Sequence, residues 1–190
     1  EYDVLRHTGS EVVDGSSAAW NTMMGIARAG VATEAQYQAL QGYLNVQDLI
    51  DYMIVHIFVG NDDWPRHNWY AARRRVPGAG YRFFSWDSEH VLKDVGLNQT
   101  AVNLSNSPAE LYDRLRRQNA EFRLLFADRI QRHFFNGGPM YVDPNATAWD
   151  PAHPERNRPA ALYMQRIDEI IASKNLGIKR IGFYAAGVRN

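Results

Sequence analysis

Three polar side chains follow apolar segments near the middle of the chain, and their types suit metal binding and acid–base chemistry. Asp63 comes after the apolar run 46–59, Asn68 follows five positions later, and Asp87 ends the segment YRFFSWD. Carboxylate and amide oxygens are ligands that Mg²⁺ accepts, together with water and phosphate oxygens. A carboxylate that holds no metal could instead accept a proton from an attacking hydroxyl group.

The two aromatic-rich segments NWYAARRR and YRFFSWD, separated by VPGAG, predict a β-hairpin with a loop of about five residues. A hairpin brings the residue before its first strand next to the residue after its second. Asn68 and Asp87 should therefore lie close together, with Asp63 on the neighbouring loop. This order is that of a protein-kinase catalytic centre, in which an Asp acts as base and a later Asn and Asp bind metal. The D-x-x-x-x-N spacing alone is a weak signal, because Asp and Asn are common.

Each of these residues also has a plain structural interpretation. Asp62 and Asp63 could end a helix or begin an Asx-turn, and we interpret Asp62 in that way. Asn68 could be a turn amide, and Asp87 could cap the next segment. Their joint placement favours the functional interpretation for Asp63, Asn68 and Asp87.

Other residues near this segment are assigned mainly to packing. His56 lies within the apolar helix and is expected to be a core histidine with satisfied hydrogen bonds. His67 and His90 flank the site and could bind metal, although zinc would need a third clustered ligand. Arg66 could pair with Asp62 or touch phosphate. Packing around the hairpin is expected for three tryptophans, Trp64, Trp69 and Trp86.

The elements that position this segment are mostly helical. Spacing of apolar residues and capping patterns predict a mostly helical α+β domain, and only helical patterns are found before Asp63. The expected helices begin after Ser16 or Ser17 and end at Gly30, then cover 34–43, 46–59, 108–118, 120–135 and 159–174. Residues 136–159, which hold most of the prolines, predict a long surface loop.

Bulk properties exclude several classes of function. The 190 residues suffice for one domain with its own core, so we predict a single domain over residues 1–190. The 21 basic and 21 acidic side chains cancel, and no nucleic-acid partner is expected. The basic cluster 73–75 is interpreted as a solvated strand end or turn. The absence of cysteine excludes disulfides and thiolate metal sites. The longest apolar run is shorter than the roughly 20 residues that span a bilayer.

The stretches GNDDWPRHNWY and YRFFSWDSEHVL resemble the spore coat protein H (CotH) kinase family, and so do EYDVLRHTGSEVVDGSSAAWNTM upstream and LYDRLRRQNAEFRLLFADRIQRHFFNGGPM downstream. The resemblance implies a protein-kinase-like fold, with ATP-dependent phosphoryl transfer to protein serines in bacterial spore-coat or cell-surface proteins. It implies a divalent metal, Mg²⁺ or Mn²⁺. By position, Asp63 corresponds to the catalytic Asp, and Asn68 and Asp87 to metal ligands. Glu89 stands where many members have a second Asp, which implies a ligand role for a side chain longer by one methylene.

One feature of the kinase pattern is missing before Asp63. A kinase covers its nucleotide with a Gly-rich loop and contacts the phosphates with a lysine, whereas lysines occur only at positions 93, 174 and 179. We therefore expect a kinase-like C-terminal lobe, part of a longer protein and without useful activity alone. ATP-dependent phosphorylation by the isolated chain, lost in Asp63→Ala, would contradict this. The alternative is a non-catalytic kinase-like scaffold in a spore coat or cell-surface assembly.

Overall fold

The computed structural model describes residues 1–7, 9 and 11–172. The chain divides into two compact units, Glu1–Arg129 and Ile130–Asn190. The single domain expected for residues 1–190 stays a prediction. The tail from residue 175, and the last two residues of the helix expected at 159–174, lie outside the described residues.

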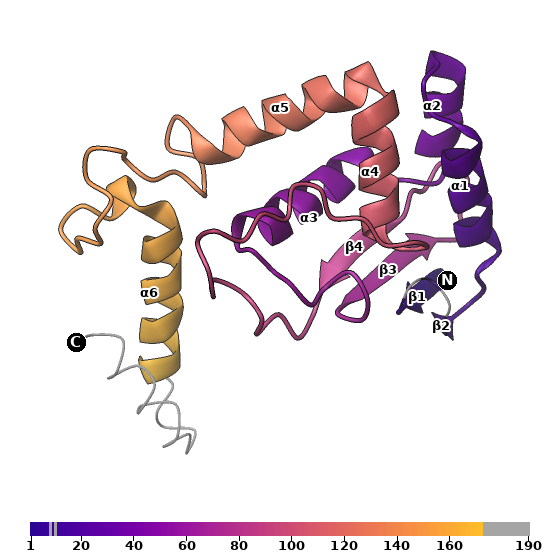
Figure 1. Ribbon diagram of the computed structural model, residues 1–190. Coiled ribbons are helices and arrows are strands. Elements are labelled where there is room, and N and C mark those ends of the chain that lie inside the picture. The colour runs from indigo at the N-terminus through magenta and orange to yellow at the C-terminus, as the bar shows by residue number, and fades with distance from the viewer. Residues whose placement is uncertain (8, 10, 173–190) are drawn as a thin grey trace. The chain divides into compact units, whose positions relative to one another are not determined.

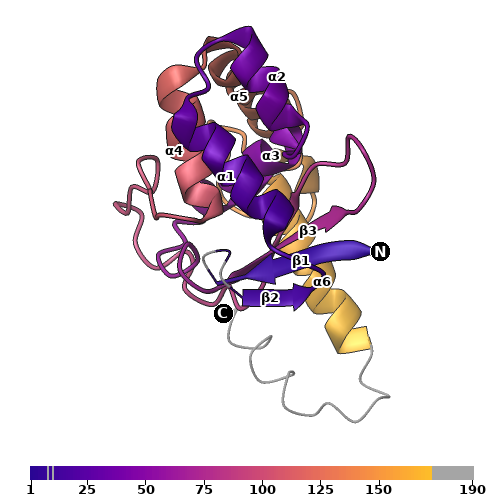
Figure 2. The ribbon, with the colours of Figure 1, turned by 90° about the vertical axis from the view of Figure 1, so that its right-hand side faces the viewer.

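A four-stranded antiparallel sheet lies in the first unit (Figure 2). Its strands are β1 (Tyr2–Arg6), β2 (Glu11–Asp14), β3 (Trp69–Arg74) and β4 (Arg82–Ser85). The spatial order is β2-β1-β3-β4, so β1 pairs with both β2 and β3. The hairpin predicted from the aromatic-rich segments is β3–β4, in register with Tyr70 opposite Phe84.

Six α-helices and one short 3₁₀ helix, η1, occur among the described residues (Figure 1). They are α1 (Ala18–Ala29), α2 (Glu34–Gln41), α3 (Val46–Phe58), α4 (Pro108–Gln118), α5 (Ala120–Phe134), η1 (Pro154–Arg156) and α6 (Arg158–Ala172). With the antiparallel sheet they make a mostly helical α+β fold, which confirms the predicted class. The six predicted helices are all present.

Local capping signals predicted the helix starts well. The Thr33 hydroxyl accepts a hydrogen bond from Gln36 N, and Thr33 N donates in turn to the Gln36 side-chain oxygen, so the expected capping box opens α2. The Asn45 side chain accepts from Asp48 N and caps α3. Ser17 precedes α1 as expected, but its side chain makes no capping hydrogen bond.

The capping box predicted for α4 is wrong in its second half. The Ser107 hydroxyl accepts from Ala109 N, so Ser107 is the cap. The Glu110 side chain instead accepts hydrogen bonds from Arg28, from Arg114 and from Asn106 N. The hydrogen bonds from Arg28 are the main reason why the pKa of Glu110 falls to about 2. Glu110 therefore ties α4 to α1 and to the chain before it.

The prediction that only helices precede Asp63 is also wrong, because β1 and β2 come first. The inward face of β1 carries Asp3, which is 4% exposed, and the fully buried Leu5. Asp3 forms ion pairs with Arg73 and Arg75. These two arginines therefore pair with the sheet rather than form a solvated strand end.

Helices α1 to α4 lie on one side of the sheet (Figure 2). On that side Trp20 of α1 stacks on Trp69 of β3, with ring centroids 5.5 Å apart, and meets Tyr81 edge-on at 5.4 Å. All three rings are fully buried. Aromatic pairs of this geometry add to the burial of apolar area and give the core a defined packing.

Helix α3 and strand β4 are joined by hydrogen bonds at their facing ends. One Asp48 oxygen accepts from Phe83 N at 2.7 Å, and the other accepts from Arg82 Nε at 2.8 Å. A Cβ on Gly80 would lie 2.4 Å from Asn45 N, so the chain before β4 approaches the start of α3 as only glycine allows. The start of β4 is thereby fixed relative to the start of α3.

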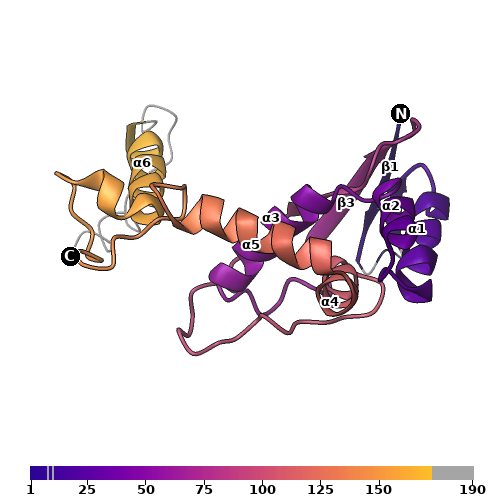
Figure 3. The same cartoon turned by 90° about the horizontal axis from the view of Figure 1, so that it is seen from above.

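The second unit contains α6 and the segment that precedes it (Figure 3). The surface loop predicted for 136–159 holds η1, and Val142 forms an isolated antiparallel bridge with Asn157. Ile167 is the buried hydrophobic residue of α6. Among the described residues, no helix is both long and apolar enough to cross a membrane.

Candidate functional site

The hairpin brings Asn68 and Asp87 together, as the sequence predicts. Trp69 pairs with Ser85 at the open end of the β3–β4 ladder, so Asn68 lies at the same end of the hairpin as the two residues that follow Ser85. The Asn68 side-chain nitrogen donates to the Asp87 carbonyl oxygen at 3.0 Å, and Trp86 N donates to the Asn68 carbonyl. The contact to Asp87 is thus made through its main chain.

Asp63 joins these two residues through the same amide. The Asn68 Nδ2 donates to Asp63 Oδ2 at 3.2 Å, so one side chain holds both the Asp63 carboxylate and the Asp87 main chain. Asp63 N donates to the Asn61 side-chain oxygen at 3.2 Å. The sequence therefore predicted correctly that Asp63, Asn68 and Asp87 lie close together.

The buried side chain of His56 links the loop 61–68 to strand β4. His56 is 1% exposed; its Nε2 lies 2.7 Å from Ser85 Oγ and its Nδ1 lies 3.1 Å from Asn61 Nδ2. Since the Asn61 amide nitrogen can only donate, Nδ1 accepts and Nε2 carries the proton. Desolvation lowers the pKa of His56 to about 4. The expectation of a core histidine with satisfied hydrogen bonds is confirmed.

All three tryptophans near the site pack around the hairpin as predicted, although only two of them are buried. Trp64 is fully buried and stacks on His56 with ring centroids 4.5 Å apart. Trp69 is also buried, and its indole nitrogen donates to Pro65 O. Trp86 is 47% exposed but meets Tyr70 of β3 edge-on, with ring centroids 6.0 Å apart. The loop 61–68 therefore has one buried indole ring at its centre and another directly after its last residue.

The oxygens that could bind a metal are not occupied by protein donors. Among the described residues, neither the Asp87 carboxylate nor Asn68 Oδ1 has a hydrogen-bond partner. Asp87 has φ of 50°, a left-handed conformation that is uncommon for residues other than glycine. Such strained backbone occurs often at functional sites. The donor set is one amide and one carboxylate oxygen, which fits a hard cation such as Mg²⁺.

Comparison of the sequence with models of protein families identifies the family of this chain. A model for the CotH kinase protein family matches residues 8–136, more than half of the chain. The chain belongs to the CotH kinase family. No curated protein and no solved structure matches it, so the likeness to protein-kinase folds stays a prediction.

The CotH segment covers all the predicted site residues, which are Asp63, Asn68, Asp87 and Glu89. It also contains every helix and strand from β2 to α5. Strand β1 and helix α6 lie outside it. That β1 is an inner strand of the sheet, and that α6 belongs to the second unit, is known from the structure alone. The metal and catalytic roles of the four site residues stay predictions.

Asp62, interpreted as structural, contacts the side chains of His90 and Lys93 on the outer side of the CotH site. Its Oδ1 lies 3.3 Å from His90 Nδ1 and 3.4 Å from Lys93 Nζ. Desolvation acts to raise the pKa of Asp62, but Lys93 and then His90 hold it below its ordinary value. The suggested pair between Arg66 and Asp62 is not formed.

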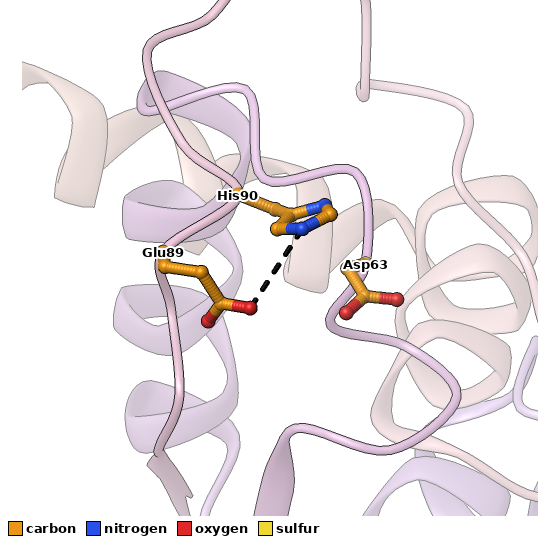
Figure 4. Close-up of side chains that lie close together, drawn as sticks. All are labelled: Asp63, Glu89 and His90. Carbon is orange, nitrogen blue, oxygen red and sulfur yellow. Dashed lines mark ion pairs between the residues drawn. The ribbon is translucent and has the colours of Figure 1, made fainter.

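Glu89 lies with Asp63 and His90 rather than with the Asn68 amide. The potential ligand atoms of these three side chains all lie within 4.8 Å of one another. Figure 4 shows the two carboxylates and one ring nitrogen of His90 facing a common space, with the ion pair of Glu89 and His90 dashed. His90, which the sequence left as a possible ligand, thus has the third clustered group that was required.

Two supporting residues of the CotH site were missed from the sequence. Asn61 forms the Asx-turn that we assigned to its neighbours, because its side chain accepts from the nitrogen two residues later. Ser85 binds His56 from β4. The Asn-Asp-Asp sequence would have allowed the turn at Asn61, but no local pattern pairs Ser85 with a histidine 29 residues earlier.

Proposed function

We propose that this CotH-family chain contributes the catalytic and metal-binding groups for ATP-dependent phosphoryl transfer to protein hydroxyl groups. The observation that supports it is the double contact of Asn68, which donates to Asp63 Oδ2 and to the Asp87 carbonyl. A kinase site needs an acceptor for the hydroxyl proton next to oxygen ligands for metal. Asn68 brings these two parts together.

Metal would be held by Asn68 Oδ1, Asp87 and Glu89. The amide nitrogen of Asn68 donates to Asp63 and to the Asp87 carbonyl, while the amide oxygen has no donor among the described residues. Asn68 can therefore bind metal through its oxygen and keep both hydrogen bonds. When bound with ATP, Mg²⁺ neutralises charge that develops on the phosphates. Glu89 is on the same loop as Asp87 and is 58% exposed at its side chain, so it can turn toward either group.

Asp63 is proposed as the group that accepts the hydroxyl proton. Its Oδ2 is engaged by Asn68, and its Oδ1 accepts no hydrogen bond from the described residues. The proton of the attacking hydroxyl would pass to Oδ1 as the oxygen–phosphorus bond forms. Asn61 fixes the main chain of Asp63, which limits the positions that the carboxylate can take.

The substrate and the place of action are proposed from family membership alone. The acceptor would be a protein serine, in the spore coat or at the cell surface of a bacterium. The alternative is a scaffold that kept the fold and lost nucleotide chemistry. Binding of Mg²⁺·ATP separates the two, and it is a better readout than turnover because no lysine precedes Asp63.

The wild-type chain is expected to bind Mg²⁺·ATP, and Asp87→Asn should weaken binding by at least about tenfold, because it removes a charged metal ligand. Calorimetric titration gives the affinity. NMR spectra of the Asn68 side-chain amide report whether the ligand lies at this site. Asp128→Asn is the matched control, since Asp128 is exposed on α5 and makes the same change of charge elsewhere.

A wild-type chain that binds no Mg²⁺·ATP would favour the scaffold. Binding that Asp87→Asn and Asp128→Asn change equally would also reject the proposed ligand. The second conclusion requires a folded Asp87→Asn variant. Its far-ultraviolet circular dichroism should match that of the wild type, because Asp87 is exposed and its side chain makes no hydrogen bond to the described residues.

A further inference from the structure

Asp63, Glu89 and His90 form a cluster that contains nitrogen as well as oxygen donors (Figure 4). His90 Nε2 lies 3.7 Å from Glu89 Oε1, and the ligand atoms of all three lie within 4.8 Å of one another. The proposed Mg²⁺·ATP site uses only oxygens. An imidazole ligand suits zinc and other transition metals better than Mg²⁺.

Asp62 orients the histidine of this cluster. Its carboxylate lies 3.3 Å from His90 Nδ1, on the side of the ring away from Glu89, and Lys93 holds the same oxygen. Histidines that bind metal commonly donate their second ring N–H to a carboxylate, which fixes the tautomer and the ring orientation. Here that donation assigns the proton to Nδ1 and leaves Nε2 as an acceptor facing the two other ligands.

Main-chain hydrogen bonds hold the two loops of the cluster together. Asp62 N donates to His90 O at 3.3 Å, and Leu92 N donates to Val59 O at 2.7 Å. The cluster is also open to solvent, since the His90 side chain is 45% exposed. An ion can therefore reach ligands whose main chains are already in place, which lowers the entropic cost of binding.

We propose that Asp63, Glu89 and His90, with Asp62 as the positioning residue of His90, form a zinc site that is filled without nucleotide. Three protein ligands and a water make the usual coordination of an open zinc site. Such a donor set binds Zn²⁺ more tightly than Mn²⁺, and Mg²⁺ prefers oxygen ligands alone.

The observed distances need only small side-chain movements. Tetrahedral ligands about 2.1 Å from zinc lie about 3.4 Å from one another. The Glu89–His90 distance of 3.7 Å is already close to this value, and Glu89 is long and exposed. Asp63 has one oxygen bound to Asn68, and the other accepts no hydrogen bond from the described residues, so Asp63 can bind zinc without losing the contact to Asn68.

Zinc at this site would have a consequence for phosphoryl transfer, and this consequence rests on the proposed function. A carboxylate that coordinates zinc cannot take up a proton from a hydroxyl group at the same oxygen. Zinc would therefore hold Asp63 in an inactive form, and removal of zinc would release it. The zinc site itself does not depend on that reaction.

The test is a calorimetric titration of the tag-free chain with Zn²⁺ alone at about pH 7.5, where histidine is neutral. We expect one ion per chain and an affinity at least about 100-fold above that for Mg²⁺. His90→Ala should remove binding, and Asp62→Asn should weaken it by about 10- to 100-fold. His67→Ala is the matched control. It lies on the same loop as Asp63, against the ring of His7, and should leave the zinc affinity unchanged.

A second measurement, by NMR on the wild-type chain, does not depend on whether the variants fold. In the wild-type chain, zinc should shift the Nε2 resonance of His90 and leave His67 unshifted. Absence of one-to-one binding, or equal loss of affinity in His67→Ala, would overturn the proposal. Binding that survives in folded His90→Ala would do the same. Because no nucleotide is present, failure here does not bear on Mg²⁺·ATP binding, and failure of the latter leaves the zinc titration intact.

Discussion

Leu5→Ala is expected to lower the free energy of unfolding by about 2–5 kcal/mol, the usual cost of truncating a buried leucine to alanine. Leu5 is fully buried on β1, opposite Ala71 of β3 on one side and Val12 of β2 on the other. Since β1 is an inner strand, the cavity would open in the middle of the sheet. Chemical denaturation followed by circular dichroism measures the loss.

The matched control is Val13→Ala on the edge strand β2. Val13 is 52% exposed, so the change should stay within about 0.5 kcal/mol. Equal losses for Leu5→Ala and Val13→Ala would mean that β1 does not form part of the core. The comparison has a further use, because β1 lies outside residues 8–136, the segment that the CotH family model matches. A large loss of unfolding free energy in Leu5→Ala would show that the folded unit extends beyond that segment.

The elements predicted correctly are those whose signals are local. The cap of α3 is formed by Asn45 and Asp48, three residues apart, and the hairpin β3–β4 is marked by its turn. The strand β1 was missed because its pattern has meaning only in the tertiary structure. Its inward side carries Asp3, a polar residue, whose partners Arg73 and Arg75 come some 70 residues later. A five-residue strand with a charged residue inside cannot be recognised from its own sequence.

The same division applies to the site. The order of helix, Asp-x4-Asn, hairpin and Asp predicted that Asp63, Asn68 and Asp87 meet, because hairpin geometry follows from the chain itself. The place of His90 could not be predicted. It depends on the irregular segment after β4 and on the main-chain hydrogen bond between Asp62 and His90, 28 residues apart. The sequence named His90 as a possible ligand but could not supply its neighbours.

Lowering the pH from 6.5 to about 4 should cost the fold about 3 kcal/mol through His56 alone. His56 is buried with Ser85 and Asn61 as its hydrogen-bond partners and with no carboxylate partner in the described part of the chain, and desolvation lowers its pKa to about 4. The unfolded chain therefore binds a proton at His56 below pH 6.5, whereas the folded chain does not until about pH 4. This stabilisation is complete above pH 6.5 and is lost as the pH falls through that window.

The range from pH 6.5 to 5 isolates this effect, and about 2 of the 3 kcal/mol should be lost there. Carboxylates with lowered pKa values act at lower pH: Glu110, with a pKa of about 2, contributes its own loss only below about pH 4.5. Denaturation in urea at several pH values gives the slope of stability with pH. His56→Gln, which cannot take up a proton, should abolish most of that slope, while His67→Gln, an exposed change, should keep it.

Direct titration of the His56 imidazole by NMR gives a second measurement that does not require the variant to fold. A pKa near 4 in the wild-type chain would support the assignment, and a value above 6 would contradict it. The outcome bears on the site, because His56 holds Asn61 and Ser85 only while it is neutral. A protonated His56 could not accept from the Asn61 amide. As the pH falls, the Asn61 turn that holds Asp63 N would then lose its hydrogen bond to His56.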